Sequence, residues 1–483
     1  MTKGKIVKNY IYNTLYQVLV LIAPLITTPY VSRVLGVTNI GVYQYSQSVA
    51  TYFVLIGAVG TNLYGQREIA YLQNSPEKRT KAFWEIVIFR MFFVLFGAII
   101  YFLIFGMHGR YELIYQILTV EIIAAAFDIS WLFMGMENFK VTVIRNSIIK
   151  FSGILCVFLF VKSKEDLPIY TVCVTLPAFL GNFSLWFSVK KYIVKVNLSV
   201  REIIDGIKTR IRPILVLFLP QIAADVYLVL DKTMIGLLAS DIDQVGYYSQ
   251  AQKIVKLVLT IVTSLGAVML PAMSAAFSRG DNEEIISSIK TAFKFIYLLS
   301  FSLLFGLCAV APCFVPLYFG KGYDPVVPLM IVISPILVII ATSNVLGKQY
   351  LLPTKQQKIF TMSIICGAGV NFILNCILIP LFNAVGASIA TVIAELAVTV
   401  VQCVCVRKQI PLKDCLISGI RYAIYGLVMF VLVSGLSSLI TVGALIKLII
   451  LVTVGVIIYS VELLVARDPM VKQGIELIKN RKK

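Results

Sequence analysis

Residues 246–273 read GYYSQAQKIVKLVLTIVTSLGAVMLPAM. This stretch is long and apolar enough to cross a membrane as one helix, yet polar side chains recur along it at every third or fourth position. That spacing places them on one face of an α-helix, over roughly 20 Å of its axis. They are Ser249, Gln252, Lys253, Lys256, Thr260 and Thr263. Because lipid cannot solvate such a face, we expect it to line a protein interior or a water-filled cavity and to mark a transport pathway.

The composition of the whole chain predicts many more such segments. Of its 483 residues, 59% are hydrophobic and 14% charged, and the mean hydropathy is +0.89, which excludes an ordinary soluble protein. About fourteen stretches are long enough to span the hydrocarbon core, so we predict an all-α integral membrane protein. The predicted spans are residues 12–32, 42–63, 83–106, 113–134, 143–162, 168–188, 213–238, 246–273, 291–318, 325–346, 360–381, 385–406, 417–440 and 444–466.

Basic residues set the predicted topology. About thirty Lys or Arg fall in the two termini and the even-numbered loops, against about five in the odd-numbered loops, so both termini are expected in the cytoplasm. The first span lacks a small-residue cleavage site and contains Pro24 and Pro29, and we interpret it as a retained helix. The net charge of +19 then reflects topology and contact with anionic lipid headgroups, and a nucleic-acid partner is unnecessary.

The residues needed for metal or hydrolytic chemistry are scarce. The nine Cys lie mostly within predicted spans without a CxxC pair, and His108 is the single histidine. Zinc sites and Ser-His-Asp sites require more ligands or partners than this. The longest predicted loop, residues 189–212, is too short for a soluble catalytic domain. We therefore expect no catalytic residue, no metal and no cofactor. Transport is expected to be coupled to a proton or sodium gradient.

The sequence pattern of the polar face occurs twice in the chain. Gly41-Val42-Tyr43 with Gln47 recurs as Gly246-Tyr247-Tyr248 with Gln252, and in that register Gln44, Gln47, Ser48 and Thr51 correspond to Ser249, Gln252, Lys253 and Lys256. We predict an N-terminal six-helix bundle (1–190), a basic cytoplasmic linker (191–212), a C-terminal six-helix bundle (213–408) and two additional spans with a basic tail (409–483). Six helices per half give the halves the same orientation, as in parallel transporter repeats, and place the substrate between them near the midplane.

Several motifs resemble one family. They are Pro29-Tyr30-Val31-Ser32-Arg33-Val34-Leu35-Gly36, Gly41-Val42-Tyr43, Gly65-Gln66-Arg67-Glu68-Ile69-Ala70, Asp231-Lys232-Thr233-Met234-Ile235-Gly236 and Val245-Gly246-Tyr247-Tyr248. Together they resemble the polysaccharide transporter family of Wzx-type lipid-linked oligosaccharide flippases, within the multidrug/oligosaccharidyl-lipid/polysaccharide exporter superfamily.

The resemblance implies two six-helix bundles that alternate between inward and outward openings in the bacterial plasma membrane. It implies transfer of an undecaprenyl-diphosphate-linked oligosaccharide to the outer leaflet for capsule or O-antigen polymers, in the company of a polymerase and a chain-length regulator.

Fixed cations in a cavity of low dielectric constant could replace the hydration of a diphosphate. We predict this role for Lys253 and Lys256, and hydrogen bonds to sugar hydroxyls for Gln47, Thr51, Gln252 and Thr260. Further candidates for substrate binding are Arg33, Arg67, Arg90, Lys150 and Lys232. For Arg33 and Arg67 the alternative is anchoring of helix ends, and for Arg90 and Lys150 it is snorkelling to the interface.

Embedded carboxylates are the candidates for ion coupling, since burial favours proton uptake. They are Asp225, Asp231, Glu395 and Glu121. Asp225 and Lys232, seven residues apart on one helix face, could also form a switchable pair, and Glu395 and Glu121 could each pair with a neighbouring lysine.

Other functions remain open at this point. A lipid II or teichoic-acid-type precursor flippase would handle the same diphosphate. A multidrug exporter of the same superfamily would favour an acidic cavity, and an integral-membrane polyprenyl-sugar transferase would need acidic motifs or histidines in a sizeable loop.

Overall fold

The computed structural model describes residues 3–471, with side chains for 22–216, 218, 222, 225–264 and 273–471. The side chains of the N-terminal basic residues, of Pro220 and of Pro271 lie outside the described part. Every predicted span falls on helix, and no strand occurs among the described residues. Ten helices in that part of the chain are long and apolar enough to cross a membrane. Of the two with 50 residues, Gln357–Val406 contains two predicted spans, and Ile22–Tyr71 contains one span and part of another. The total of fourteen spans stays a prediction.

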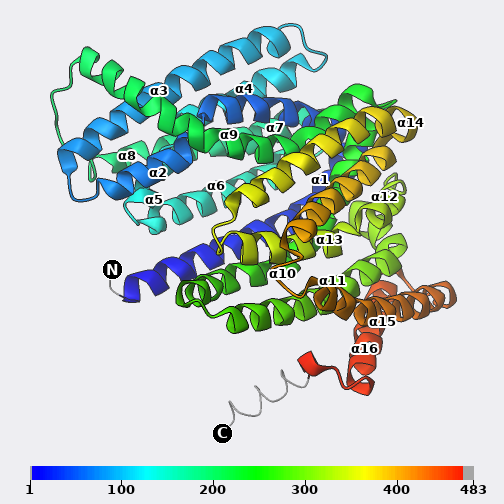
Figure 1. The fold of residues 1–483 in the computed structure, drawn as a ribbon. Coiled ribbons are helices and arrows are strands. Elements are labelled where there is room, and N and C mark those ends of the chain that lie inside the picture. Colours follow the sequence, from blue (N-terminus) through cyan, green and yellow to red (C-terminus); the bar gives the residue numbers. More distant parts are fainter. Residues whose placement is uncertain (1–2, 472–483) are drawn as a thin grey trace. The chain divides into compact units, whose positions relative to one another are not determined.

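The chain forms two compact units that divide after Gly236. Unit 1 contains the first helices (Figure 1). These are α1 (Lys3–Ala58), α2 (Thr61–Tyr71), α3 (Pro76–Tyr101), η1 (Phe102–Gly106), α4 (Glu112–Ala126), α5 (Ser130–Gly135), α6 (Phe139–Phe160), η2 (Lys164–Asp166), α7 (Leu167–Ser184), α8 (Trp186–Val189) and α9 (Val200–Leu238). The unit boundary thus falls inside α9, near its end.

Two expected loops are replaced by single-residue breaks. The expected loop at residues 33–41 is wrong, because α1 is helical on both sides of Gly36, whose φ of 77° and ψ of 171° join the two helices. Glycine adopts this backbone readily because it lacks a Cβ atom. Asn383 likewise joins two helical parts of α14 (Gln357–Val406), with φ 52° and ψ −131°. Its Oδ1 accepts a hydrogen bond from the backbone N–H of Ser240 at 2.9 Å.

The expected long loop at residues 189–212 is also shorter than predicted. Helix α9 begins at Val200, so the irregular segment ends there. Ser199 and Glu202 form a reciprocal cap, with the Ser199 backbone N–H donating to Glu202 Oε2 at 2.8 Å and the Glu202 N–H donating to Ser199 Oγ at 3.2 Å. The N–H and hydroxyl of Ser199 hold the pKa of the Glu202 carboxyl below its usual range. This cap starts a helix of 39 residues, nearly twice the length that a bilayer core requires.

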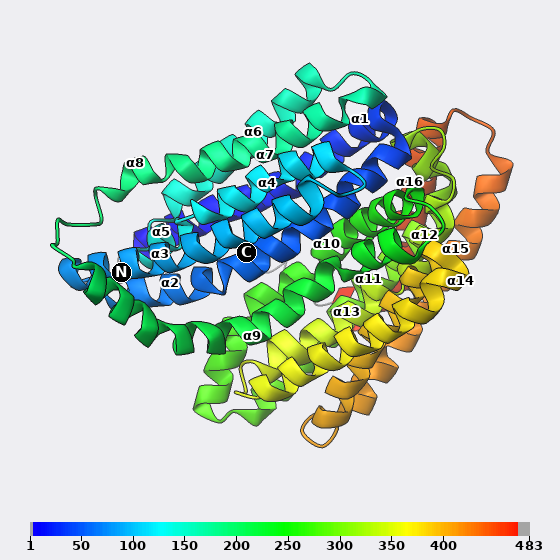
Figure 2. The ribbon, with the colours of Figure 1, turned by 90° about the horizontal axis from the view of Figure 1, so that it is seen from above.

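Unit 2 contains the remaining helices (Figure 2). They are α10 (Asp243–Arg279), α11 (Asn282–Phe319), α12 (Val326–Ile333), α13 (Ile336–Asn344), η3 (Val345–Leu351), α14, α15 (Leu412–Leu439) and α16 (Ala444–Val465). Pro335 stands at the break between α12 and α13, whereas Pro24, Pro29 and Pro177 lie inside helices that continue past them.

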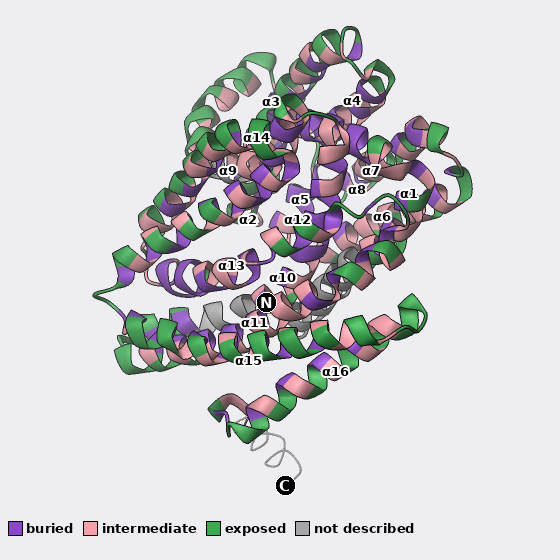
Figure 3. Cartoon of the chain, turned by 90° about the vertical axis from the view of Figure 1, so that its right-hand side faces the viewer, coloured by how far each residue is buried: buried purple, intermediate pink, exposed green. Residues whose placement is uncertain are grey.

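The last two helices pack against α11. Met429 of α15, Leu451 of α16 and Tyr297 of α11 share one buried apolar cluster. Other turns of α15 and α16 carry exposed residues (Figure 3), among them Val431 and Val456 at 59% and 62% exposure. Exposed apolar side chains along such helices suit a hydrocarbon environment.

Candidate functional site

Helix α9 supplies a cation to the polar face of α1. Lys232 Nζ donates to Gln44 Oε1 at 2.7 Å, and the hydroxyls of Ser48 and Thr233 lie 2.8 Å apart. The α1 residues of this face, Gln44, Gln47, Ser48 and Thr51, are all uncharged. In the structure of unit 1, however, a lysine from α9 lies on it. A combination of cation, amide and hydroxyl groups is suited to contact phosphate and sugar oxygens.

Helices α9 and α1 approach closely where Gly236 packs against the Tyr45 ring. A Cβ atom on Gly236 of α9 would lie 2.1 Å from the Tyr45 ring of α1, which no side chain could tolerate without a shift. Glycine at residue 236 therefore permits the approach that brings Lys232 and Thr233 to α1.

The adjacent polar residue of α1 faces α4. The Gln47 side chain is placed to hydrogen-bond Glu121 of α4, and Tyr43 and Tyr101 lie near the same carboxylate. Glu121 Oε2 is buried without a hydrogen-bond partner among the atoms described. Thr51 donates to the backbone oxygen of Gln47 at 2.7 Å. The described neighbours of Glu121 are thus an amide and tyrosines, an environment that can hold a proton or a small cation.

The other acidic candidates of unit 1 lie on α9. Asp231 is buried at 4% exposure and Asp225 is half-buried. Pairing of Asp225 with Lys232 stays a prediction, since the described bond of Lys232 goes to Gln44.

Near its amino-terminal end, α9 is bound to α2 and α3 by Arg210. Arg210 donates from Nε to Glu85 Oε2 at 2.5 Å, and from Nη1 to Glu68 Oε1 at 2.6 Å and to the Tyr64 hydroxyl at 2.8 Å. Glu85 is 1% exposed, so the α3 carboxylate is buried beneath the guanidinium. Sequence reasoning assigned Arg210 only to a basic linker and missed this contact. The available signal was Glu85, an acidic residue near the start of a predicted span.

A glycine on α9 makes room for this carboxylate. A Cβ on Gly206 would lie 1.9 Å from Glu85 Oε1, so Gly206→Ala should displace Glu85 from Arg210 and lower the stability by about 1–3 kcal/mol, as overpacking does. Thermal unfolding of the purified protein measures this effect. Gly435→Ala on α15 is the control, since a Cβ there meets nothing within 4 Å. Equal unfolding midpoints for the two variants would contradict the packing argument.

The predicted arginines and Lys150 lie in different environments within unit 1. Arg90 is buried at 2% exposure, with Nε donating to Ala125 O at 2.7 Å and Nη1 donating to Asn62 Oδ1 at 2.5 Å. Arg33 and Arg67 are exposed, and Lys150 on α6 is half-buried. The Arg67 guanidinium lies 5.8 Å from the centre of the Tyr64 ring. Arg90 is therefore bound to its own bundle, and any role in substrate binding would require these bonds to open.

The polar row on α10 in unit 2 divides into two groups. Gln252 Nε2 donates to the Tyr248 hydroxyl at 2.9 Å, which lies 3.1 Å from Thr391 Oγ1 of α14. Thr260 donates to the backbone oxygen of Lys256 at 2.9 Å, and Thr263 to that of Leu259 at 3.2 Å. Ser249 is buried at 4% exposure. Much of the neutral part of the row thus binds protein groups.

The charged members of that row are Lys253 and Lys256, which are half-buried. Glu395 of α14 is also half-buried, and its backbone oxygen accepts a hydrogen bond from Thr399 at 2.9 Å.

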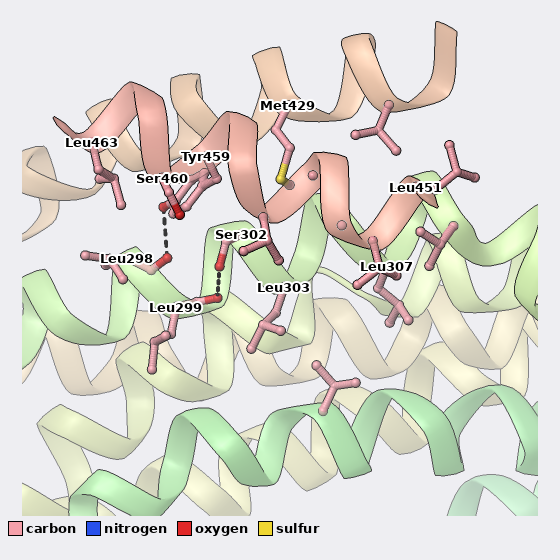
Figure 4. A pocket seen from close by; sticks show the side chains of 17 residues that line it. Leu298, Leu299, Ser302, Leu303, Leu307, Met429, Leu451, Tyr459, Ser460 and Leu463 are labelled. Atoms are coloured by element: carbon pink, nitrogen blue, oxygen red, sulfur yellow. Dashed lines mark hydrogen bonds between the residues drawn. The ribbon is translucent and has the colours of Figure 1, made fainter. Parts of the chain in front are cut away.

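Unit 2 also contains an apolar cavity of about 420 Å³, lined mainly by α11, α15 and α16 (Figure 4). Two of its three hydroxyl groups donate to the backbone, Tyr459 to Leu298 O at 2.8 Å and Ser302 to Leu299 O at 2.9 Å, and the third belongs to Ser460. Most of the other lining side chains are aliphatic, such as Leu303 and Leu451. This lining suits a hydrocarbon chain.

Comparison with known proteins places the chain in a family. The pattern of the family described as "Polysaccharide biosynthesis protein" matches residues 6–277. The chain belongs to this polysaccharide biosynthesis protein family. A family member of Escherichia coli (strain K12), named for O-antigen transport, is 25% identical over 83% of this chain and 97% of its own length. A protein of Haloferax volcanii, named for flipping in low-salt glycan biosynthesis, is 22% identical over 48% of each chain.

Solved structures support the fold. The lipid II flippase MurJ in an inward closed conformation has a TM-score of 0.72 at 17% identity, over 96% of this chain and 100% of the other. An inward-facing multidrug resistance MATE family transporter has a TM-score of 0.60 at 11% identity, over 81% and 95%. This member of the polysaccharide biosynthesis protein family is thus an all-α integral membrane protein, and the relatives named here are transporters and flippases rather than enzymes.

Proposed function

We propose that this protein is a flippase for an undecaprenyl-diphosphate-linked oligosaccharide. It moves the repeat unit from the cytoplasmic to the outer leaflet of the bacterial plasma membrane, for export of a capsule- or O-antigen-type polysaccharide. The observation that carries the proposal is the pair Lys253 and Lys256, half-buried on a helix of a membrane protein whose family is described by polysaccharide biosynthesis. A cation at membrane depth is costly, and an anionic cargo explains its presence.

The diphosphate is the group that these lysines bind. In unit 1, Lys232 with Gln44 adds a cation beside an amide, and Gln47, Thr51, Gln252 and Thr260 are the proposed partners of sugar hydroxyls. Because Gln252 and Thr260 already bind protein groups, sugar binding at those residues exchanges one hydrogen bond for another. Arg33, Arg67, Arg90 and Lys150 are weaker candidates, of which Arg33 and Arg67 are exposed.

The polyprenyl tail requires a different environment from its head. The aliphatic cavity beside α11 and α16 offers such an environment within unit 2. A lipid-linked cargo thus finds cationic and apolar groups in one protein, whereas a free sugar would have no use for the apolar cavity.

Coupling to a proton or sodium gradient supplies the direction of transport by alternating access. Glu121 is the foremost site, because its Oε2 is buried without a partner among the described atoms. Asp225, Asp231 and Glu395 are the further candidates. The proposed topology places both termini in the cytoplasm, and a polymerase and a chain-length regulator are the expected partners after transfer.

A flipping assay in proteoliposomes tests the proposal. Purified protein is reconstituted with an undecaprenyl-diphosphate oligosaccharide, and transfer is followed as exposure of the sugar to an impermeant glycan-modifying enzyme. We expect transfer above the rate in protein-free vesicles and a rate that responds to an imposed pH or sodium gradient. Transfer of lipid II in preference to the oligosaccharide would indicate a precursor flippase. Export of cationic dyes without any lipid transfer would indicate a multidrug exporter and overturn the proposal.

A further inference from the structure

A second apolar groove lies on unit 1, away from the residues assigned above. It runs between α6 and α7, which lie side by side (Figure 2), and encloses about 760 Å³. The helices touch at its floor, because a Cβ on Gly181 of α7 would lie 2.0 Å from Ile149 Cδ1 of α6. Its walls carry aliphatic side chains such as Ile148, Val172 and Leu180, exposed at 62%, 39% and 54%.

The groove lies within the membrane-spanning part of the unit. Both α6 and α7 belong to segments long and apolar enough to cross the bilayer. From Arg145 to Phe160 the α6 wall rises about 22 Å, most of a hydrocarbon core of about 30 Å. Water is not a suitable occupant of an apolar groove at this depth, whereas a hydrocarbon chain parallel to the helices is.

One end of the groove carries a cation. Among the described residues of the lining, Arg145 is the single acidic or basic one. Its Nη1 donates to Asn182 Oδ1, and Asn182 Nδ2 donates in turn to Ala124 O at 2.8 Å. The guanidinium is thus held at the amino-terminal end of α6, while Phe160 and Pro168 close the other end. The groove therefore matches a phospholipid, because its cationic end suits the phosphate headgroup and its apolar length suits an acyl chain.

The lining also excludes the sugar-bearing cargo as its occupant. An oligosaccharide needs many hydrogen-bond partners, and the groove offers few. The hydroxyls of Ser152 and Ser184 both donate to the backbone, to Ile149 O at 3.1 Å and Gly181 O at 2.7 Å. An arginine is sufficient for a lone phosphate, to which it can donate two hydrogen bonds.

We propose that the groove between α6 and α7 is a binding site for an anionic phospholipid of the bilayer, with one acyl chain along the groove and the phosphate at Arg145. The proposal rests on membrane insertion and does not depend on which cargo the protein moves.

Lipid competition on the full-length protein tests this site. Wild-type protein is placed in nanodiscs of equal parts phosphatidylglycerol and phosphatidylcholine. It is then released from the nanodiscs in the mass spectrometer at low collision energy, and native mass spectrometry counts the lipids that stay bound to it. We expect phosphatidylglycerol to be retained about fivefold in preference, the factor expected for one cation at a headgroup. Arg145→Gln should abolish the preference. Lys140→Gln, which removes the same charge from α6 outside the lining, should leave it unchanged.

A groove-filling variant separates the site from general surface charge. Val172→Trp should lower the number of retained lipids by one while Arg145 is intact, and it supplies the test if Arg145→Gln does not fold. Equal loss of preference in Arg145→Gln and Lys140→Gln, or unchanged retention in Val172→Trp, would overturn the proposal. Displacement of phosphatidylglycerol by equimolar undecaprenyl phosphate would overturn it as well, because the occupant would then be a polyprenyl lipid.

Discussion

Replacement of both Lys253 and Lys256 by alanine is expected to lower oligosaccharide flipping by at least about 100-fold, because hydrogen bonds to charged groups contribute about 1.5–3 kcal/mol each. Both lysines are half-buried on α10, where little water is available to replace them around a diphosphate. The measurement is the initial rate of lipid transfer in proteoliposomes with matched amounts of protein.

Two controls belong with that pair. The double variant with arginine at both positions keeps the charge and should retain most of the rate, although arginine binds phosphate in a different geometry. Thr263→Val removes a hydroxyl that donates to the backbone of its own helix and should leave transport near the wild-type rate. A normal rate in the double alanine variant would remove both lysines from the proposed site.

Arg90→Leu is expected to destabilise unit 1 by about 3 kcal/mol, the lower part of the range for removing one member of a buried ion pair. Arg90 is 2% exposed, its Nη2 lies 3.8 Å from Asp128 Oδ2, and it donates to groups on α2 and α4. The lower value applies because the Asp128 side chain is 21% exposed and water can partly replace the arginine. Thermal unfolding in detergent reports the change.

Arg90→Lys and Arg201→Leu make that result interpretable. Lysine keeps the charge, but its compact ammonium cannot reproduce the planar fork of guanidinium donors, so its unfolding midpoint should lie between those of wild type and Arg90→Leu. Arg201 is exposed at the start of α9, and its replacement should have little effect on stability. If Arg90→Leu unfolded like the wild type but failed to move substrate, Arg90 would belong to the binding site rather than to the framework.

Local patterns were sufficient to predict the helices, but not how they join. A stretch of about 20 apolar residues can satisfy its backbone in lipid only as a helix, so each predicted span falls on helix. Loops were harder to predict, because Gly36 turns the chain within one residue and the segment after Val200 continues as helix. Both depend on backbone geometry and capping rather than on hydrophobicity.

The same division applies to the candidate site. The membrane class and the family could be predicted from residue types and motifs alone, and the placement of Lys253 and Lys256 on one polar helix face follows from their spacing. The folded structure was needed to show that Lys232 lies on the polar face of α1, that Arg210 binds α9 to α2 and α3, and that Arg90 is buried within unit 1. These contacts join residues 28 to 188 positions apart. The helical period relates residues within one helix, and it carries no information about which faces of different helices meet.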